Sequence, residues 1–280
     1  IFEQVEDALS GVVLEKGLES RLSRVAQSTF NTKRNNAPFR HLLLYGPPGT
    51  GKTLFAKGLA RHSGLEYAIM TGGDIAPLGR DAVTEMHKVF DWAQASRKGL
   101  LLFVDEADAF LRRRNSEAIS EDLRNALNAF LYRTGESTVR SKIQVPSSEE
   151  NQNTSNKTRS WLFPCAVDKF MLVYASNQPE QFDWAVNDRI DEMVPFDLPG
   201  REERLRMVNL YMKNYLLDPP GRAKIITVDG IEDGHLQKVA DLTEGFSGRE
   251  IAKLAIAWQA AAYGTPDSSF NAELMTEVLE

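Results

Sequence analysis

The stretch GPPGTGKT at residues 46–53 decides the fold. It fills the pattern G-x-x-x-x-G-K-[ST], and it stands between an apolar run that suits a strand, 41–45, and a helical pattern that begins near Leu54. Glycines at these positions let the backbone wrap closely enough for its N–H groups to hold phosphate oxygens, and the following helix adds the positive end of its dipole. A chance glycine-rich turn is the competing explanation, but the strand–loop–helix setting favours a phosphate-binding loop (P-loop).

Two side chains of the loop and two acids further along suit the chemistry of a nucleoside triphosphate. Lys52 supplies a point charge to the β- and γ-phosphates, and Thr53 offers a hydroxyl to Mg²⁺. The run LLLFVDE (100–106) is a buried strand that delivers Asp105 and Glu106 at its carboxyl end. We expect Asp105 to reach the metal, directly or through water, and Glu106 to polarise the attacking water as a general base. The alternative is a strand that simply ends in solvated acids.

Alternating strand and helix patterns surround these motifs. The strand runs are 41–45, 67–71, 100–104, 170–175 and, less clearly, 192–196. Helical patterns lie between them, which predicts an α/β fold with a five-stranded parallel sheet covered on both faces. After Pro199 the pattern changes to helices at 201–217, 232–242 and 248–263. We therefore expect an α/β domain over 1–198, followed by a small all-helical lid domain over 199–280.

Composition narrows the class of protein. The net charge of −6 argues against a surface that coats nucleic acid, so no direct nucleic-acid site is expected. The single cysteine, Cys165, permits no intrachain disulfide and favours a reducing compartment. No apolar run approaches the roughly 20 residues needed to cross a bilayer, and the four histidines show no metal-ligand spacing. Because the chain begins at Ile1 and ends in an unfinished helical pattern, we expect it to be a fragment.

Four motifs in this order resemble the AAA-family ATPases. They are GPPGTGKT (46–53), VDEAD (104–108), ASN (175–177) and GFSG (245–248). Four longer stretches resemble the ATPase domain of one mitochondrial subfamily: MTGGDIAPLG (70–79), VDEADAFLRRR (104–114), LNAFLYRTGE (127–136) and SNQPEQFDWAVNDRIDEMV (176–194). The resemblance covers nearly the whole chain, and it implies a P-loop AAA+ fold with ATP and Mg²⁺ as ligands.

The resemblance implies roles for residues outside the P-loop. Asn177 matches the position whose amide hydrogen-bonds the γ-phosphate or the attacking water; the alternative is a cap of the turn before Pro179. Arg189 lies where the family places arginine fingers, which stabilise the charge that develops in a neighbouring subunit's site. Many relatives have two arginines here, and this segment has only one. The alternative for Arg189 is a surface arginine paired with Asp188 or Asp191.

The nucleotide contacts implied by the resemblance extend into the helical part. Gly248 is expected to contact the nucleotide, whereas Arg249 either reaches it as a sensor arginine or points to solvent. Adenine recognition is expected near 12–14. The residues expected to bind nucleotide are Gly46, Pro47, Pro48, Gly49, Thr50, Gly51, Lys52, Thr53, Leu54 and Gly248, those expected to act in catalysis are Lys52, Glu106, Asn177 and Arg189, and the metal ligands are Thr53 and Asp105.

The resemblance also implies a setting. We expect a homo-oligomeric ring, most simply a hexamer, at the mitochondrial inner membrane, with links to nucleoid organisation and to membrane or lipid homeostasis, and with a protein, lipid or nucleoid client of unknown identity. Pro77 stands where protein-threading relatives place an aromatic residue in the loop 74–79, so threading is weakly supported. The competing function is an ATP-dependent scaffold with little turnover. A GTPase switch has no support, because there is no Asn-Lys-x-Asp motif.

Two stretches do not fit the pattern. Residues 137–168 are polar and rich in Asn and Ser, which is long for a loop inside a compact domain, and they are expected to be exposed and poorly ordered. A genuine loop and a translated intron are both open, since 141–142 and 162–167 can be encoded by splice-like codons. The basic cluster 112–114 either lines the inner face of a ring or is a solvated turn.

Overall fold

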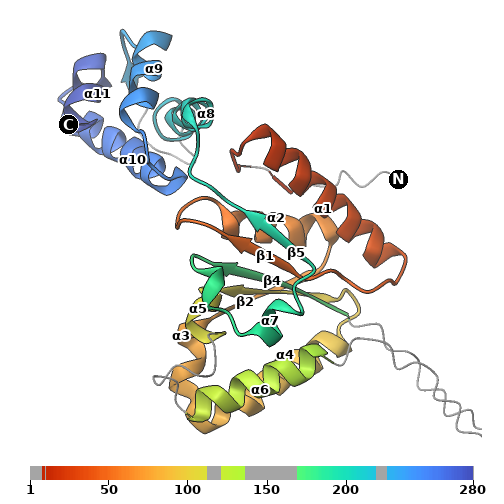
Figure 1. The fold of residues 1–280 in the computed structure, drawn as a ribbon. Coiled ribbons are helices and arrows are strands. Elements are labelled where there is room, and N and C mark those ends of the chain that lie inside the picture. Colours follow the sequence, from red (N-terminus) through yellow and green to blue (C-terminus); the bar gives the residue numbers. More distant parts are fainter. Residues whose placement is uncertain (1–7, 10, 112–120, 136–168, 219–225, 280) are drawn as a thin grey trace, which may run out of the picture.

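A computed structural model of the chain describes residues 8–9, 11–111, 121–135, 169–218 and 226–279 (Figure 1). The basic cluster 112–114 and the segment 137–168 lie outside the described residues. Within the described part, no helix is both long and apolar enough to cross a membrane.

The centre of the molecule is a five-stranded parallel sheet with the strand order β2-β3-β4-β1-β5. The strands are β1 (Leu42–Tyr45), β2 (Glu66–Thr71), β3 (Leu100–Asp105), β4 (Phe170–Ser176) and β5 (Glu192–Pro195). All four neighbouring pairs are parallel, so every strand ends at the same edge of the sheet. The five predicted strands and their parallel arrangement are confirmed.

Helices cover both faces of this sheet, as Figure 1 shows. One face carries α1 (Lys16–Arg34) and α2 (Lys52–Ser63); the other carries α4 (Ala82–Ala95) and α6 (Glu121–Gly135), with the short helices α3 (Gly72–Ile75), η1 (Ala76–Asp81), α5 (Ala107–Phe110), η2 (Pro179–Gln181) and α7 (Trp184–Asn187). The central strand β4 explains the two layers, because all of its residues are buried and successive side chains point to opposite faces. Met171 packs in the core under α1 and α2, whereas Leu172 packs in the core under α4 and α6.

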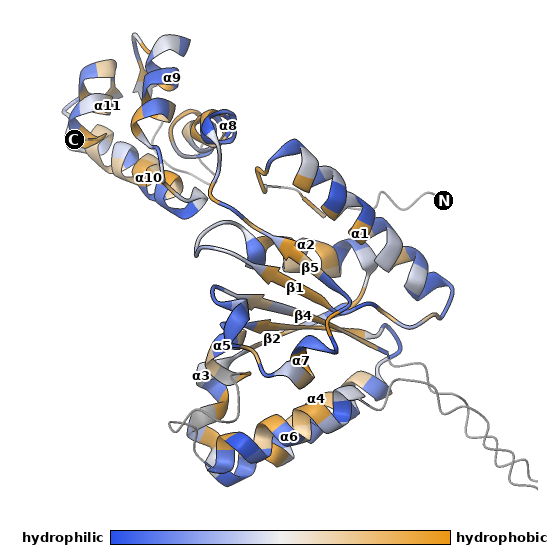
Figure 2. Cartoon of the chain, in the orientation of Figure 1, coloured by the Kyte–Doolittle hydropathy of each residue, from blue (hydrophilic) through white to orange (hydrophobic). Residues whose placement is uncertain are grey.

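Hydropathy follows this layering. In Figure 2 the strands are coloured as hydrophobic, and the visible side of α1 is mostly hydrophilic. Phe90 of α4 illustrates the packing: its ring centroid lies 5.8 Å from that of Phe130 and 5.1 Å from that of Phe170, so three aromatic side chains close the gap between two helices and the sheet. Burying an aromatic side chain of this kind contributes about 1.5–3 kcal/mol.

The remaining residues form a helical part with its own core. Its elements are α8 (Arg201–Met212), the π-helix η3 (Lys213–Leu217), β6 (Thr227–Val228), α9 (Asp233–Leu242), α10 (Gly248–Gly264), β7 (Ser269–Phe270) and α11 (Ala272–Leu279). This core includes the fully buried Trp258, and the division near residue 199 stays a prediction.

The helical part is not wholly helical. Strands β6 and β7 form a two-residue parallel pair, which the sequence pattern does not predict. Strands this short have no hydrophobic period to detect. Tertiary packing stabilises the pair, since Phe270 is fully buried with its ring centroid 5.8 Å from that of Trp258.

Candidate functional site

The loop at 46–53 needs its glycines. It runs from the end of β1 into the first two residues of α2, and Gly46, Gly49 and Gly51 have φ angles of 139°, 78° and 103°. Residues with side chains rarely adopt such angles. A Cβ on Gly46 would also lie 2.2 Å from the carbonyl oxygen of Phe196. The backbone can therefore make this turn only with glycine, and the turn leaves a cradle lined by main-chain atoms.

The first turn of α2 directs free amide donors at this cradle. The first intrahelical hydrogen bond runs from the N–H of Phe55 to the carbonyl oxygen of Gly51, over 2.9 Å. The preceding N–H groups, of Lys52, Thr53 and Leu54, thus have no partner inside the helix. Because the Leu54 side chain is exposed, any contact made by Leu54 in the cradle would come from its backbone. Free amides at a helix N-terminus suit an anionic ligand.

Lys52 bridges the cradle and the tip of β4. Its Nζ donates to the carbonyl oxygens of Gly46 and Pro47, each over 2.7 Å, and to Oδ1 of Asn177 over 3.2 Å. The residue is 8% exposed. Burial lowers the pKa of Lys52 below its ordinary value, and the nearby Asp105 carboxylate partly opposes that shift. Among the described residues no carboxylate forms an ion pair with this ammonium group, so its charge remains available to a ligand.

Two oxygen atoms that could bind a metal ion meet beside the cradle, one from Thr53 and one from Asp105. Oγ1 of Thr53 donates to Oδ2 of Asp105 over 3.2 Å, joining α2 to the end of β3. A hydroxyl and a carboxylate are ligands that Mg²⁺ prefers. No group of three or more His, Cys, Asp or Glu side chains that could hold a metal occurs in the described residues. The pair therefore fits a metal that is held partly by phosphate and water, as Mg²⁺ usually is.

Glu106 follows Asp105 in an unusual backbone conformation. Its φ is 48° and its ψ is 43°, in the left-handed region, and its own N–H donates to Oδ1 of Asp105 over 3.0 Å. The Glu106 side chain is exposed. A strained conformation of this kind costs about 1–3 kcal/mol and often marks a functional position. The geometry turns the chain sharply at the end of β3 and leaves the Glu106 carboxylate free to face a ligand.

Asn177 sits at the tip of β4, and a neighbouring contact fixes this tip. Ser176 Oγ donates to Oδ1 of Asp108 over 2.9 Å and accepts a hydrogen bond from the N–H of Gln178 over 3.0 Å. Asp108 is absent from the residues expected above. Its position three residues after Asp105, in the same VDEAD stretch, is the signal that could have found it. Asp108 holds the turn that presents the Asn177 amide.

The helical part rests on the cradle through the start of α10. The N–H of Arg249 donates to the carbonyl oxygen of Gly49 over 3.2 Å, and a Cβ on Gly49 would lie 2.8 Å from Ser247 Oγ. Gly248 is buried there, and a Cβ on it would lie 3.4 Å from the same Gly49 oxygen. The Arg249 side chain is exposed. Gly248 thus touches the P-loop through its backbone, and Arg249 through its backbone and Cβ, and a contact of either with the nucleotide stays a prediction.

A cavity of about 500 Å³ opens next to the P-loop, between the sheet domain and the helical part. It is lined by residues from the segment before α1, from α1, from the P-loop, from the end of β5 and its continuation, and from α8: Val13, Leu14, Glu15, Gly17, Leu18, Arg21, Thr50, Pro195, Asp197, Leu198, Pro199, Gly200, Glu203 and Met207. The segment 12–14, expected near adenine, contributes Val13 and Leu14 to this lining. The sequence motifs do not predict a place for the linker residues, Asp197 to Gly200, in this lining.

Comparison with known proteins decides the family. The sequence profile of the "ATPase family associated with various cellular activities (AAA)" matches residues 42–198, which is more than half of the chain. The chain belongs to the AAA family. Within it, this AAA domain is 56% identical over 273 residues to "ATPase family AAA domain-containing protein 3" of Xenopus tropicalis and 54% identical over 277 residues to the Homo sapiens protein 3A, covering 97% and 98% of the chain. The subfamily indicated by the four longer stretches is therefore confirmed.

These relatives are more than twice as long as the AAA domain, which spans 41% of the Xenopus protein and 42% of the human one. Among solved structures, the crystal structure of the FIGL-1 AAA domain in complex with ADP aligns with a TM-score of 0.68 and covers 96% of this chain and 82% of that one. At 19% sequence identity this likeness confirms the fold alone.

Arg189 of the AAA domain lies at the opposite edge of the sheet from the P-loop, just before β5, whose first residue pairs with the first residue of β1. Its guanidinium turns inward. Nη1 donates to the carbonyl oxygen of Ala185, and Nη2 donates to that of Leu131 over 3.3 Å. Nε is buried without a hydrogen-bond partner among the described residues. Arg189 therefore does not meet its own P-loop, and a role in a neighbouring subunit's site stays a prediction.

Residues 74–78 of the AAA domain are helical rather than a loop, and the chain kinks at Gly79, whose φ is 51° and ψ is −123°. The segment 74–79 comprises the end of α3 and most of the 3-10 helix η1, and Pro77 lies in the first turn of η1, where a proline costs no hydrogen bond. Asp74 accepts a hydrogen bond from the N–H of Thr71 over 2.8 Å. Leu78 is 41% exposed, so it is available to a partner.

Proposed function

We propose that this AAA domain binds Mg²⁺–ATP and hydrolyses it to ADP and phosphate. The observation that carries the proposal is the meeting of Lys52, Thr53, Asp105 and Asn177 at the carboxyl edge of the sheet, from three separate elements. In an open parallel α/β sheet, ligands bind at this edge. The family membership and the glycine cradle support the same assignment.

Each residue has a role that its position supports. The P-loop amides and the Lys52 ammonium bind the phosphates, and Thr53 and Asp105 would hold Mg²⁺, which neutralises phosphate charge when bound. Glu106 accepts a proton from the attacking water as general base, a task that its exposed carboxylate permits. The Asn177 amide orients that water or the γ-phosphate. The cavity beside Thr50 has the size and position to take the nucleoside end.

We further propose that the domain works as one subunit of a homo-oligomeric ring, most simply a hexamer, in which Arg189 leaves its seat against α6 and stabilises charge in the neighbouring site. The resemblance to the mitochondrial subfamily supports a setting at the inner membrane, with a part in nucleoid organisation and in membrane or lipid homeostasis. Mass measurements with and without ATP test assembly. Normal turnover by assembled Arg189→Ala rings would remove the finger assignment.

A second function is favoured by two specific observations. By resemblance, Pro77 stands where protein-threading relatives place an aromatic residue, and Arg189 is hydrogen-bonded within its own subunit. Both suit a scaffold in which bound ATP sets the oligomeric state and turnover is slow. The positions of Asp105, Glu106 and Asn177 around the cradle favour hydrolysis instead.

Phosphate release by the purified chain tests the proposal. Glu106→Gln is expected to bind ATP as tightly as the parent and to release phosphate at least about a hundredfold more slowly, because the general base is lost. Glu202→Gln, at an exposed position on α8, is the matched control and should leave ATP affinity and the rate of phosphate release unchanged. If the parent releases no more phosphate than Glu106→Gln while ATP still promotes assembly, the scaffold function is correct.

A further inference from the structure

Residues from both parts of the molecule line the cavity beside the P-loop. The segment before α1, residues 12–15, is called the strap, and its residues 13–15 form one wall. Another is the linker at 197–200, and α8 adds Glu203 and Met207. Neither the strap nor the linker is part of a helix or strand, so both need other contacts to keep their positions.

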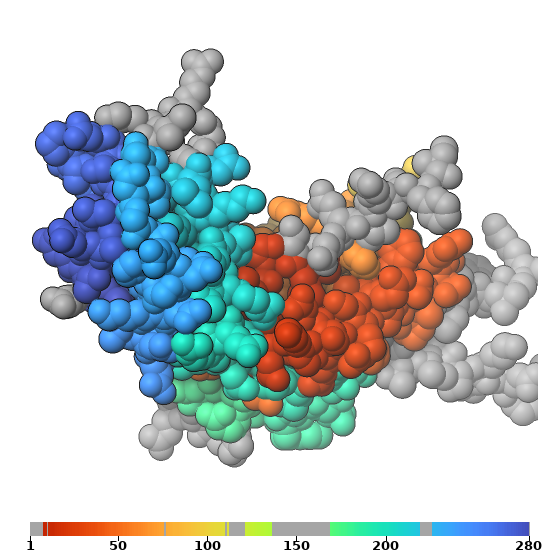
Figure 3. All heavy atoms as spheres, turned by 90° about the horizontal axis from the view of Figure 1, so that it is seen from above, coloured from red at the N-terminus to blue at the C-terminus, as the bar shows by residue number. Residues whose placement is uncertain are grey.

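The strap lies between three structures, and its side chains alternate among them. A Cγ atom of Val12 lies 3.2 Å from where a Cβ of Gly51 would be, so Val12 packs on the P-loop. Val13 packs against the core of the helical part, whereas Leu14, 6% exposed, belongs to the core of the sheet domain. The strap is thus the place where the P-loop, the sheet domain and the helical part meet. Figure 3 shows the α8 region (teal) directly against the α1 region (red).

An arginine of α8 holds the strap from the side of the helical part. Nη2 of Arg206 donates to the carbonyl oxygen of Leu14, a contact between residues 192 positions apart. Its Nη1 lies 3.7 Å from Oε2 of Glu19, in the first turn of α1, and Nη2 lies 3.5 Å from Oε1 of Glu203 on α8 itself. The Arg206 side chain remains 41% exposed. Arg206 therefore spans from the helical part to the strap without being part of either core.

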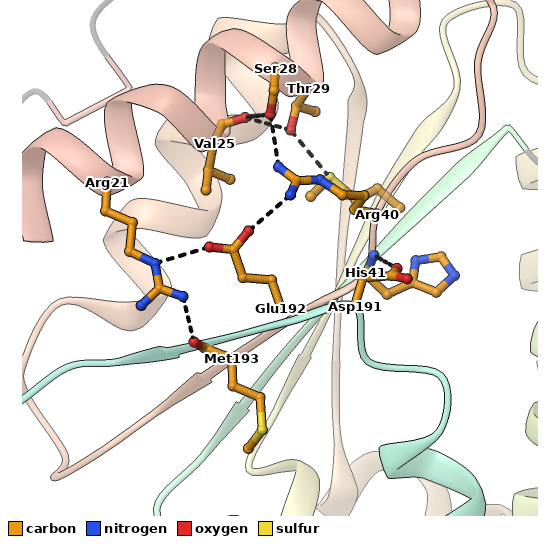
Figure 4. A network of polar contacts seen from close by, with 10 residues as sticks. Arg21, Val25, Ser28, Thr29, Arg40, His41, Asp191, Glu192 and Met193 are labelled. Carbon is orange, nitrogen blue, oxygen red and sulfur yellow. Dashed lines mark hydrogen bonds and ion pairs between the residues drawn. The ribbon is translucent and has the colours of Figure 1, made fainter.

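Another arginine anchors α1, the helix after the strap, to the sheet domain. Arg21 donates through Nη2 to the carbonyl oxygen of Met193 over 2.9 Å and through Nε to Oε1 of Glu192 over 3.0 Å (Figure 4). The other Glu192 oxygen lies 3.2 Å from Nη1 of Arg40. Because α1 is fixed to β5 in this way, movement of the strap relative to the helical part is opposed by its contacts with that part, namely the packing of Val13 and the hydrogen bond from Arg206 of α8.

We propose that Arg206 is a positioning residue for nucleotide binding, which holds the strap as a wall of the cavity and so sets the affinity for the nucleoside end of the ligand. The inference rests on the proposed function, because it assigns the cavity to the nucleoside. It separates two parts of the ligand: the phosphates depend on the P-loop, and the nucleoside depends on the contact between Arg206 and the strap.

Arg201 provides a matched control on the same helix. Its side chain is 52% exposed and pairs with Asp241 of α9, entirely within the helical part, and Arg201 does not line the cavity. Removing Arg201 tests what the loss of an exposed arginine and an ion pair does to α8. Such surface pairs contribute little to stability, so both variants are expected to fold.

The experiment compares Mg²⁺–ATP, Mg²⁺–ADP and magnesium tripolyphosphate, each titrated into the 280-residue chain by calorimetry. Arg206→Gln should bind ATP and ADP about fivefold more weakly, the loss expected for one hydrogen bond, and bind tripolyphosphate as the parent does. Arg206→Lys should lose less affinity for ATP and ADP than Arg206→Gln does, and Arg201→Gln should change none of the three affinities. Amide exchange in the strap should be faster in Arg206→Gln only.

The outcomes separate this inference from the function on which it rests. If the parent binds tripolyphosphate and ATP equally, the cavity takes no nucleoside and the inference fails while a phosphate-binding loop remains. Equal ATP affinities of Arg206→Gln and the parent would overturn the inference alone. A parent chain that binds none of the three ligands would overturn the proposed function as well.

Discussion

Nζ of Lys52 donates a hydrogen bond to Oδ1 of Asn177 over 3.2 Å, joining two residues that lie 125 positions apart in the chain. The bond crosses from the start of α2 to the tip of β4, because β1 and β4 are neighbours in the sheet and end at the same edge. An ammonium group and an amide held together over a glycine cradle form a site that can sense a terminal phosphate. The roles proposed for both residues depend on this arrangement.

Replacing Asn177 with Ala should lower phosphate release about 10- to 100-fold while ATP affinity changes less than about threefold. The amide is expected to act on the water or the γ-phosphate during the reaction, and loss of one such polar group typically has an effect of this order. Gln178→Ala is the control, since the Gln178 side chain bonds to Gln181 instead. Equal turnover by the two variants would show that Asn177 only caps its turn.

Thr53→Ala should raise the Mg²⁺ concentration needed for half-maximal turnover, because the hydroxyl that faces Asp105 is lost. Thr53→Ser keeps a hydroxyl at the same place and should retain most of the parent's magnesium dependence. The measurement is a magnesium titration of phosphate release at saturating ATP. Identical curves for the Ala and Ser variants would remove Thr53 from the metal site.

Gly49→Ala should lower the free energy of unfolding by about 1–3 kcal/mol, since the φ of 78° suits only glycine and a Cβ would lie 2.8 Å from Arg249 Cβ. Gly234→Ala is the contrasting change. Gly234 lies within α9 with open space around it, so alanine there should raise stability by about 0.5–1 kcal/mol. Urea unfolding measures both. A neutral Gly49→Ala would contradict the tight contact between the P-loop and α10.

Tyr67 should make the chain lose stability at alkaline pH. Burial, assisted by the Asp105 carboxylate, raises the pKa of Tyr67 from its ordinary 10.0 to about 12. Between these values the unfolded chain releases this proton first, so stability falls as the pH rises from about 10 to 12. The Tyr67→Phe variant should not lose stability in this pH range through residue 67. It also lacks a buried hydroxyl that has no hydrogen-bond partner among the described residues.

The test for Tyr67 is urea unfolding of the parent and Tyr67→Phe at about pH 9 and about pH 11, on either side of the ordinary tyrosine pKa. The stability advantage of the Phe variant should be larger at the higher pH. An advantage that does not change between the two pH values would show that Tyr67 has an ordinary pKa in the folded chain.

Local sequence patterns were sufficient to predict the sheet and the glycine cradle. β3 is a continuous apolar run and α4 carries a helical stripe, so the sequence reveals both, and a P-loop requires its glycines wherever it occurs. The carboxyl ends of parallel strands share one edge, so the meeting of Asp105 with Thr53 results from the order of the elements.

Contacts made by tertiary packing could not be predicted in this way. Arg206 and the Leu14 carbonyl oxygen meet only because the helical part sits over the start of α1. Asp108 binds Ser176 because α5 turns back across the tip of β4. The inward seat of Arg189 likewise depends on how α6 ends beside α7. The VDEAD stretch could have drawn attention to Asp108, but nothing in the sequence predicts the partner atoms of any of these three side chains.

The central claim is that Lys52 binds the phosphates of ATP within the glycine cradle. Its most direct test is ATP binding by the purified chain, measured in parallel for Lys52→Ala and for Lys57→Ala, an exposed lysine of the same helix. Lys52→Ala should bind at least about tenfold more weakly, because a charged hydrogen-bond donor to phosphate is lost, and Lys57→Ala should bind as the parent does. Undiminished ATP binding by Lys52→Ala would contradict the account.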